Sequence, residues 1–298
     1  MNNEDQASPR AVSPISTGPA GSHFEAQVGA SYLLALLTGA EPRGLPGTSI
    51  DQVELQRAAE GRPLDDVIVH AHDVRGNKAT LEIQVKREVT FAPSDEVFRD
   101  VVHQIAAAAR RPDFWSSRYE LAIATAKISR KIAGPYQDVL TWARHLGSAA
   151  TFVDRINRRG SSNADMRSFV KTFRSRLEEA GAPHNDETVW RLLGRLQILF
   201  FDFTAQGSAD ESLARDRAAK ALHPADAPHG GSLWTILVEL ALRVAASGGD
   251  RTRDGLIDDL RGVPFRLAGE RRHATTRIRL GEASQNAPAD IGDLVGGV

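Results

Sequence analysis

The chain of 298 residues contains no cysteine, only two methionines and few aromatic residues. The absence of cysteine excludes disulfide bonds, catalysis by a thiolate and zinc sites with cysteine ligands. No apolar run approaches the roughly 18–20 residues that a membrane-spanning helix needs. Residues 1–20 lack both the charged start and the apolar stretch of a signal peptide. We therefore expect a soluble, cytoplasmic protein.

An excess of charge of either sign is also absent, because 37 basic and 38 acidic residues leave a formal net charge of −1. This balance excludes a uniformly basic coat for nucleic acid but leaves room for a local basic surface. Lysine is scarce, since only six of the basic residues are lysine: Lys78, Lys86, Lys127, Lys131, Lys171 and Lys220. Lysine and arginine differ as partners of phosphate and metal. The position of each lysine is therefore informative.

The first half of the chain alternates between helical and extended patterns. Residues 1–20 are rich in Pro, Ser and Gly and are expected to be a disordered N-terminal segment. Apolar periodicity then predicts helices at 22–37, 94–110 and 132–145, a weak strand at 50–56, and clear strands at 66–72, 78–86 and 120–126. The strands at 66–72 and 78–86 form a hairpin around Gly76. Residues 21–150 are thus predicted to form a compact α/β unit.

The second half has a different character. Helical patterns dominate at 163–179, 186–198, 208–221, 231–246 and 252–261, which predicts a mostly helical accessory or assembly domain over residues 151–265. The apolar run Leu196–Phe203 interrupts them and fits either a strand or the buried end of a helix. Residues 266–298 are expected to be a C-terminal extension or linker.

Polar side chains of the kinds that bind metal ions or act in catalysis lie on the hairpin. Strand alternation places Glu82, Gln84 and Lys86 on one face. If facing residues pair around Gly76, Asp66 lies opposite Lys86, although a one-residue shift would break this relation. An ordinary half-exposed strand and a turn at Asp65-Asp66 would give the same pattern.

An acid, an amide and a lysine at one end of a hairpin can serve phosphodiester hydrolysis. This reaction needs a divalent metal to offset phosphate charge and to lower the pKa of the attacking water. Mg²⁺ prefers oxygen ligands, which Asp66 and the carbonyl of Gln84 can supply, together with the backbone carbonyl of Val85. Lys86 would orient the hydroxide and offset the negative charge of the transition state.

The order of acidic residue, hairpin and QxK resembles the PD-(D/E)xK nuclease superfamily, in the QxK variant of Mrr-type restriction endonucleases. Gly21-Ser22-His23-Phe24-Glu25 resembles the GxxFE element, which implies that Glu25 joins the site as a catalytic and metal-binding residue. Residues 21–110 resemble the double-strand DNA endonuclease domain of bacterial anti-phage defence effectors, and residues 187–260 resemble the helical segment that follows it. The resemblance implies a restriction-endonuclease-like αβββαβ core and Mg²⁺ as cofactor, with Mn²⁺ as a substitute.

Two features depart from the family pattern. Gln84 stands where a second acidic ligand is usual, which lowers the charge at the metal site unless Glu25 or Glu82 contributes. No P-loop signature (GxxxxGK[ST]) occurs in the chain. A sensor or NTPase module is therefore expected outside this chain or in a partner.

A basic stretch in the second half is a further candidate for DNA contact. It comprises Arg158, Arg159, Arg167, Lys171 and Arg174, and its helical members share a face. Such a stretch can follow a phosphate backbone without reading sequence, although a solvated helix face would look the same. His70 and His72 belong to no histidine motif for metal, and no GxSxG serine-hydrolase motif occurs.

The sequence therefore favours a Mg²⁺-dependent endonuclease of double-stranded DNA that acts in anti-phage defence. Cleavage of both strands is most simply achieved by two protomers, so we expect a dimer or higher homo-oligomer. Two alternatives remain open. One is a catalytically silent, nuclease-like scaffold that binds nucleic acid, and the other is a DNA repair or junction-resolving nuclease.

Overall fold

The computed structural model describes residues 19–57 and 61–268. The expected disordered segment 1–20 and the extension 266–298 lie almost wholly outside these ranges. The described residues up to Ala268 belong to one compact unit. None of the described helices is long and apolar enough to cross a membrane.

The centre of the fold is a mixed six-stranded sheet with the order β5-β4-β3-β2-β1-β6. Its strands are β1 (Thr48–Leu55), β2 (Val67–Asp73), β3 (Lys78–Val85), β4 (Arg118–Thr125), β5 (Leu196–Phe200) and β6 (Asp250–Thr252). β2 pairs antiparallel with β1 and β3, whereas β4 is parallel to both β3 and β5. The α/β class predicted from the sequence is therefore confirmed.

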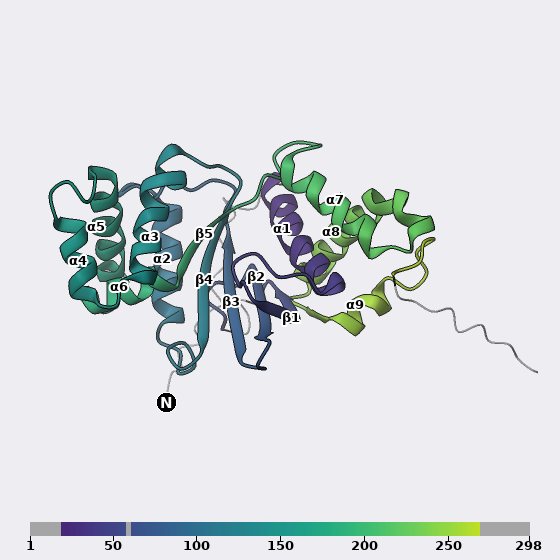
Figure 1. The fold of residues 1–298 in the computed structure, drawn as a ribbon, viewed down its shortest axis with the longest axis horizontal. Helices are drawn as coiled ribbons and strands as arrows, with labels where there is room; N and C mark the ends of the chain where they lie inside the picture. Colours follow the sequence, from purple (N-terminus) through teal and green to yellow (C-terminus); the bar gives the residue numbers. More distant parts are fainter. Residues whose placement is uncertain (1–18, 58–60, 269–298) are drawn as a thin grey trace, which may run out of the picture. The chain divides into compact units, whose positions relative to one another are not determined.

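Helices cover both faces of this sheet (Figure 1). They are α1 (Pro19–Thr38), α2 (Glu96–Ala108), α3 (Gln137–His145), α4 (Ala149–Asn157), α5 (Ala164–Glu179), α6 (Asp186–Arg195), α7 (Ala209–Ala221), α8 (Gly230–Ala246) and α9 (Arg253–Asp259). A π-helical turn, Ile132–Tyr136, precedes α3, and a 3₁₀ turn, Pro224–His229, precedes α8. The order α1-β1-β2-β3-α2-β4 reproduces the predicted αβββαβ succession.

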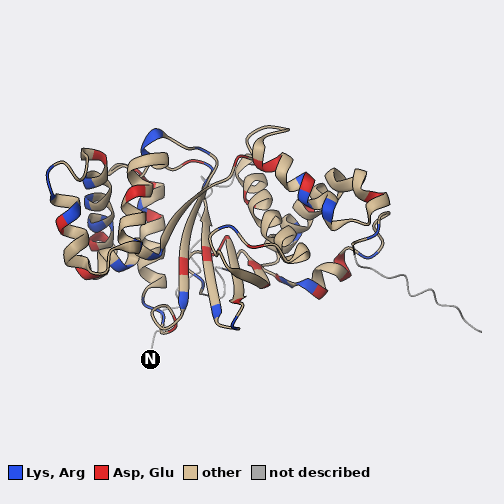
Figure 2. Cartoon of the chain, viewed as in Figure 1, with Lys and Arg blue, Asp and Glu red and all other residues tan. Residues whose placement is uncertain are grey.

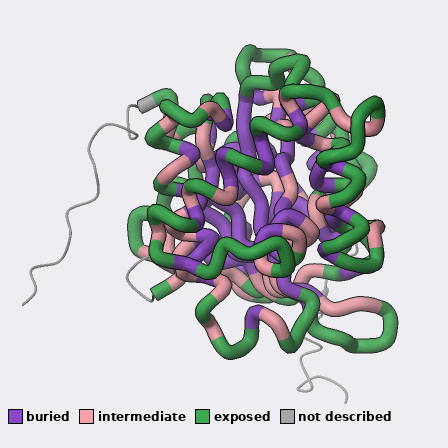
Figure 3. Tube along the Cα trace, turned by 90° about the vertical axis from the view of Figure 1, so that its left-hand side faces the viewer, coloured by how far each residue is buried: buried purple, intermediate pink, exposed green. Residues whose placement is uncertain are grey.

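Strand alternation divides the interior into two cores. Leu81, Ile83 and Val85 of β3 pack with α1 and α8, whereas Leu121 and Ile123 of β4 face the opposite core beneath α2 and α3. Figure 3 shows the buried strands enclosed by partly exposed helices. On the face of β3 that points away from the α1 core, the polar Glu82 and Gln84 are nevertheless buried. Buried polar groups of this kind require partners, and they mark the region of the site.

The predicted register of the hairpin is wrong by two residues. Val67 pairs with Ile83 and Ile68 with Glu82, so that Asp66 reaches the level of Gln84 rather than Lys86. The reason is the turn: the Asp73 carboxylate accepts hydrogen bonds from the backbone N–H groups of Arg75 and Asn77 at 2.8 and 2.9 Å. This contact centres the turn on Arg75 instead of Gly76. A shift of two residues preserves the face to which each side chain points.

The second half of the chain also contributes to the sheet. The apolar run beginning at Leu196 forms strand β5 rather than a helix end, and β6 pairs with β1 at the other edge. Helix α4 was not predicted. The sheet thus extends beyond the expected boundary at residue 150.

Candidate functional site

The structure brings Asp66, Gln84 and Lys86 together where β2 begins and β3 ends. Oδ2 of Asp66 accepts hydrogen bonds from Nε2 of Gln84 at 2.5 Å and from the backbone N of Val85 at 2.7 Å. Nζ of Lys86 lies 3.9 Å from the same oxygen. Asp66 is 7% exposed and Gln84 2%, whereas the Lys86 side chain is 20% exposed. Only the lysine therefore reaches solvent.

Gln56 is a member of this cluster that the sequence did not reveal. Its Nε2 donates to Oδ1 of Asp66 at 3.0 Å, so both carboxylate oxygens are engaged. Gln56 has a φ of 54°, in the left-handed region that non-glycine residues seldom adopt. A strained residue at the end of β1 could not be inferred from its sequence, because that strand pattern was weak.

Glu25 joins the site from α1. Its pKa is raised from 4.5 to about 7, mainly by burial and next by the negative charge of Asp66, while Lys86 lowers it and Asp65 adds a smaller increase. Burial likewise raises the pKa of Asp66, against the lowering effect of Lys86 and of the hydrogen bonds from Val85 and Gln56. A half-buried and a buried carboxyl group that disfavour each other's charge are stabilised by a proton or by a cation.

A half-open pocket of about 300 Å³ lies beside these acids. Glu25, Gln56 and Asp66 supply its polar wall. Its apolar wall comes from α8, through Ala241, Leu242, Ala245 and Ala246. The helical half of the chain thus borders the candidate site, which the sequence analysis placed within residues 21–150.

The donor set fits a hard divalent cation. Oε1 of Gln84 is buried and has no hydrogen-bond partner among the described residues, which leaves it available as a ligand. The described residues contain no group of three or more His, Cys, Asp and Glu arranged to hold a metal. A cation here would therefore depend on Asp66, Glu25, the Gln84 amide oxygen and water. Mg²⁺ tolerates this arrangement because it keeps several of its waters.

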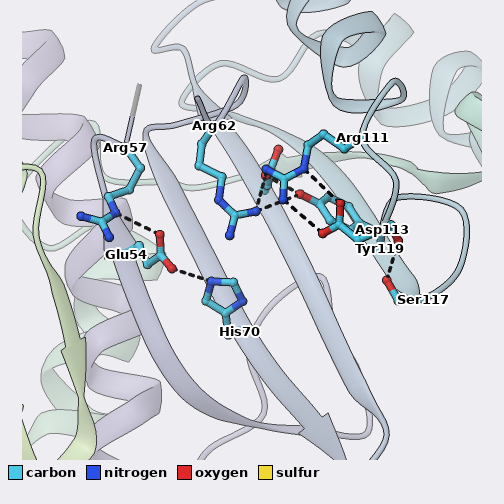
Figure 4. A network of polar contacts seen from close by, with 9 residues as sticks. Glu54, Arg57, Arg62, His70, Arg111, Asp113, Ser117 and Tyr119 are labelled. Carbon is cyan, nitrogen blue, oxygen red and sulfur yellow. Dashed lines mark hydrogen bonds and ion pairs between the residues drawn. The ribbon is translucent and has the colours of Figure 1, made fainter. Parts of the chain in front are cut away.

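Glu82 is next to the site but has partners of its own. Its Oε1 accepts a hydrogen bond from the Tyr119 hydroxyl and lies 3.4 Å from Nη1 of Arg62 and 3.7 Å from Nη1 of Arg111. Figure 4 shows these two arginines converging over the sheet, with Asp113 beside Arg111. Glu82 is held in this network through Oε1, while its buried Oε2 has no hydrogen-bond partner among the described residues. Glu25 is the better placed second acid because it lines the pocket together with Asp66.

The histidines on β2 are engaged with carboxylates. Nε2 of His70 lies 2.7 Å from Oε1 of Glu54 (Figure 4). This hydrogen bond is the main reason that the pKa of Glu54 is lowered to about 2. His72 similarly contacts Asp51 at 2.7 Å. These contacts tie β1 to β2 and give both histidines a structural role.

The basic stretch is not part of this cluster. It lies on α5 and in the turn between α4 and α5, in the outer layer beyond α2 and α3 (Figure 1). Arg158 forms an ion pair with Asp154, Arg174 with Asp186 at 2.5 Å, and Arg167 donates to the carbonyl of Ser162 at 2.9 Å. Within the described ranges, only Arg159 and Lys171 of this set lack such a contact. Its role in DNA binding stays a prediction.

Comparisons with known proteins place the chain in no family. No protein-family model matches it, and neither does any curated protein. A solved structure described as a Moraxella osloensis Cap4 SAVED/CARF-domain containing receptor has a TM-score of 0.44 at 11% identity, over 82% of this chain and 47% of that one. The Acinetobacter baumannii Cap4 receptor, solved with the cyclic trinucleotide 3'3'3'-cAAA, gives 0.46 at 10% identity, over 84% and 45%. The chain spans about half the length of these receptors. At this level, neither similarity assigns a function.

Proposed function

We propose that the chain is a metal-dependent endonuclease that hydrolyses phosphodiester bonds of double-stranded DNA. The observation that carries the proposal is the convergence of Asp66, Gln84 and Lys86 on one buried point, with Glu25 beside the same pocket. The sequence resemblance to PD-(D/E)xK nucleases, which rests on the order of these same residues along the chain, supports it. A role as effector module in anti-phage defence, under control of a sensor or NTPase partner, is part of the proposal and rests on that resemblance.

The residues of the site have complementary tasks. Asp66, Glu25 and Oε1 of Gln84 would hold Mg²⁺. When bound, Mg²⁺ offsets charge on the phosphate and acidifies the attacking water. Lys86, the partly exposed member, can donate to a non-bridging phosphate oxygen and offset the negative charge that develops there. Val85 and Gln56 fix the Asp66 carboxylate by direct hydrogen bonds, so the anionic group is oriented before substrate arrives.

The test is incubation of the purified protein with linear and supercoiled plasmid in Mg²⁺, Mn²⁺ or EDTA. We expect cutting in either metal and none in EDTA. A parallel sample carries a fused dimerisation segment, because cleavage of both strands is proposed to need two protomers. If plasmid stays intact in both metals even for the dimerised protein, the proposal fails and the silent-scaffold alternative replaces it.

The raised pKa of Glu25 predicts a pH-dependent metal affinity. Glu25 keeps its proton up to about pH 7, well above its usual value of 4.5, and this proton competes with a cation. The affinity for Mn²⁺ should therefore increase as pH rises, by about tenfold per unit below pH 7 for one released proton, and level off above it. Calorimetric titrations at pH 6 and pH 8 measure this change. The Glu25→Gln variant should show a weaker pH dependence, because only the raised pKa of Asp66 then contributes; equal dependence in both proteins would remove Glu25 from the metal site.

A further inference from the structure

Three of the six lysines gather at one end of the sheet. Lys86 begins the loop between β3 and α2, and Lys127 and Lys131 lie in the loop that leads from β4 to the π-helical turn. Because β3 and β4 are parallel neighbours, both loops leave from the same end of the sheet. The strand pairing continues into them: Lys86 N donates to Ala124 O at 2.8 Å, and Ala126 N donates to Arg87 O at 3.3 Å. The two loops therefore lie side by side.

The loops enclose a hollow of about 470 Å³. Its inner wall includes Val89, Phe91 and Tyr136, and its rim carries Lys127 and Lys131. The first loop is held in place by the Asp95 carboxylate, whose Oδ2 accepts from the backbone N–H groups of Thr90 and Phe91 at 2.7 and 3.1 Å. The hollow thus has a fixed wall and lies only a few residues along the chain from Lys86.

The two loops around the hollow carry more positive than negative charge. Glu88 lies 2.6 Å from Lys127, and Asp165 lies 2.8 Å from Lys131, but both lysine side chains stay about 60% exposed. Arg87 and Arg130 are exposed and form no ion pair with any residue in the described ranges. Figure 2 shows basic segments where these loops cross the top of the sheet.

We propose that a basic loop cluster binds the phosphate backbone of duplex DNA beside the phosphodiester bond that is hydrolysed at Lys86. The cluster consists of Arg87, Lys127, Arg130 and Lys131. This inference rests on the proposed function and adds the surface that holds its substrate. Exposed cations around a fixed hollow suit phosphate oxygens, whose contacts position a duplex without reading its sequence. Arg87 directly follows the partly exposed Lys86 in the chain, so one DNA strand can contact Lys86 and the basic loop cluster together.

The test is the salt dependence of binding to a fluorescent 30-base-pair duplex, measured by anisotropy in EDTA so that no cutting occurs. Each lost phosphate contact lowers the slope of log K against log salt by about 0.9. The variant Arg87→Glu/Arg130→Glu should therefore lose about two units of slope and on the order of tenfold in affinity. Arg167→Glu/Lys171→Glu tests the basic stretch on α5 separately. The matched control is Arg75→Glu/Lys78→Glu, at the exposed opposite end of the β2–β3 hairpin, which should bind as the wild type does. Melting curves confirm that all three variants fold.

The inference would be overturned if the salt slope of binding in Arg87→Glu/Arg130→Glu equalled that of the wild type. It would also be overturned if only Arg167→Glu/Lys171→Glu lowered this slope. Failure of the wild type to bind duplex at low salt would overturn it too. The plasmid assay separates this failure from that of the proposed function. Binding through the cluster without any metal-dependent cutting refutes the nuclease but keeps the surface, whereas cutting that is insensitive to Arg87→Glu/Arg130→Glu refutes only the surface.

Discussion

Replacement of Lys86 by alanine is expected to lower the rate of metal-dependent plasmid cleavage at least about a hundredfold, the loss typical of removing one group that stabilises transition-state charge. The ammonium group is the only cation within 4 Å of the Asp66 carboxylate among the described ion pairs, at 3.9 Å. In the wild type, the positive charge of Lys86 lowers the pKa of Asp66 and opposes the effect of burial. Removal of Lys86 therefore raises the pKa of Asp66. Both changes act against cleavage.

The readout for this variant is the initial rate of supercoiled plasmid loss under conditions in which the wild type cuts. Lys78→Ala is the matched control, since Lys78 begins the same strand at its exposed opposite end. It should cut at the wild-type rate, and the melting temperatures of both variants should match the wild type. Wild-type cleavage by Lys86→Ala would remove this lysine from the site.

Replacement of Phe169 by alanine is expected to lower the free energy of unfolding by about 3–5 kcal/mol, as for other buried aromatic residues. Phe169 on α5 is 1% exposed. Its ring stacks on Tyr136 at 4.5 Å and on Phe98 at 6.2 Å, and meets Phe91 edge-on at 5.8 Å. It therefore joins the helical half of the chain to α2 and to the loop that follows β3.

Thermal unfolding followed by circular dichroism measures this effect. In a unit of this size the melting temperature should fall by roughly 10 °C. The exposed Ser175→Ala on the same helix is the control and should change little. Because α5 shares a core with the sheet, the whole transition should shift as one. A separate transition for the helical half, with the sheet unaffected, would contradict this description.

Most of the regular elements could be predicted because their patterns are long and local. The strands of the hairpin and the helices after residue 163 follow from alternation and periodicity. The hairpin register could not be predicted, because it depends on the hydrogen bonds of one side chain, Asp73, within the turn. The sequence left the structure of Leu196–Phe203 open, since a short apolar run does not distinguish a strand from a helix.

The site was predictable to a similar degree. Asp66, Gln84 and Lys86 follow from strand parity, which survived the register error. Glu25 came only from the resemblance, because nothing in its own helix indicates that it meets β2. Gln56 and the α8 wall of the pocket were missed, since both depend on tertiary packing between distant segments. Whether Arg158, Arg159, Arg167, Lys171 and Arg174 contact DNA stays a prediction.

The most direct test of the central claim is metal binding itself, because it needs neither DNA nor an activating partner. Mn²⁺ is titrated at pH 8 into the wild type, Asp66→Asn and Asp65→Asn, and bound metal is followed by electron paramagnetic resonance. We predict that the wild type and Asp65→Asn bind Mn²⁺ and that Asp66→Asn does not. Absence of binding in the wild type, or a greater loss in Asp65→Asn than in Asp66→Asn, would contradict a metal site built on Asp66.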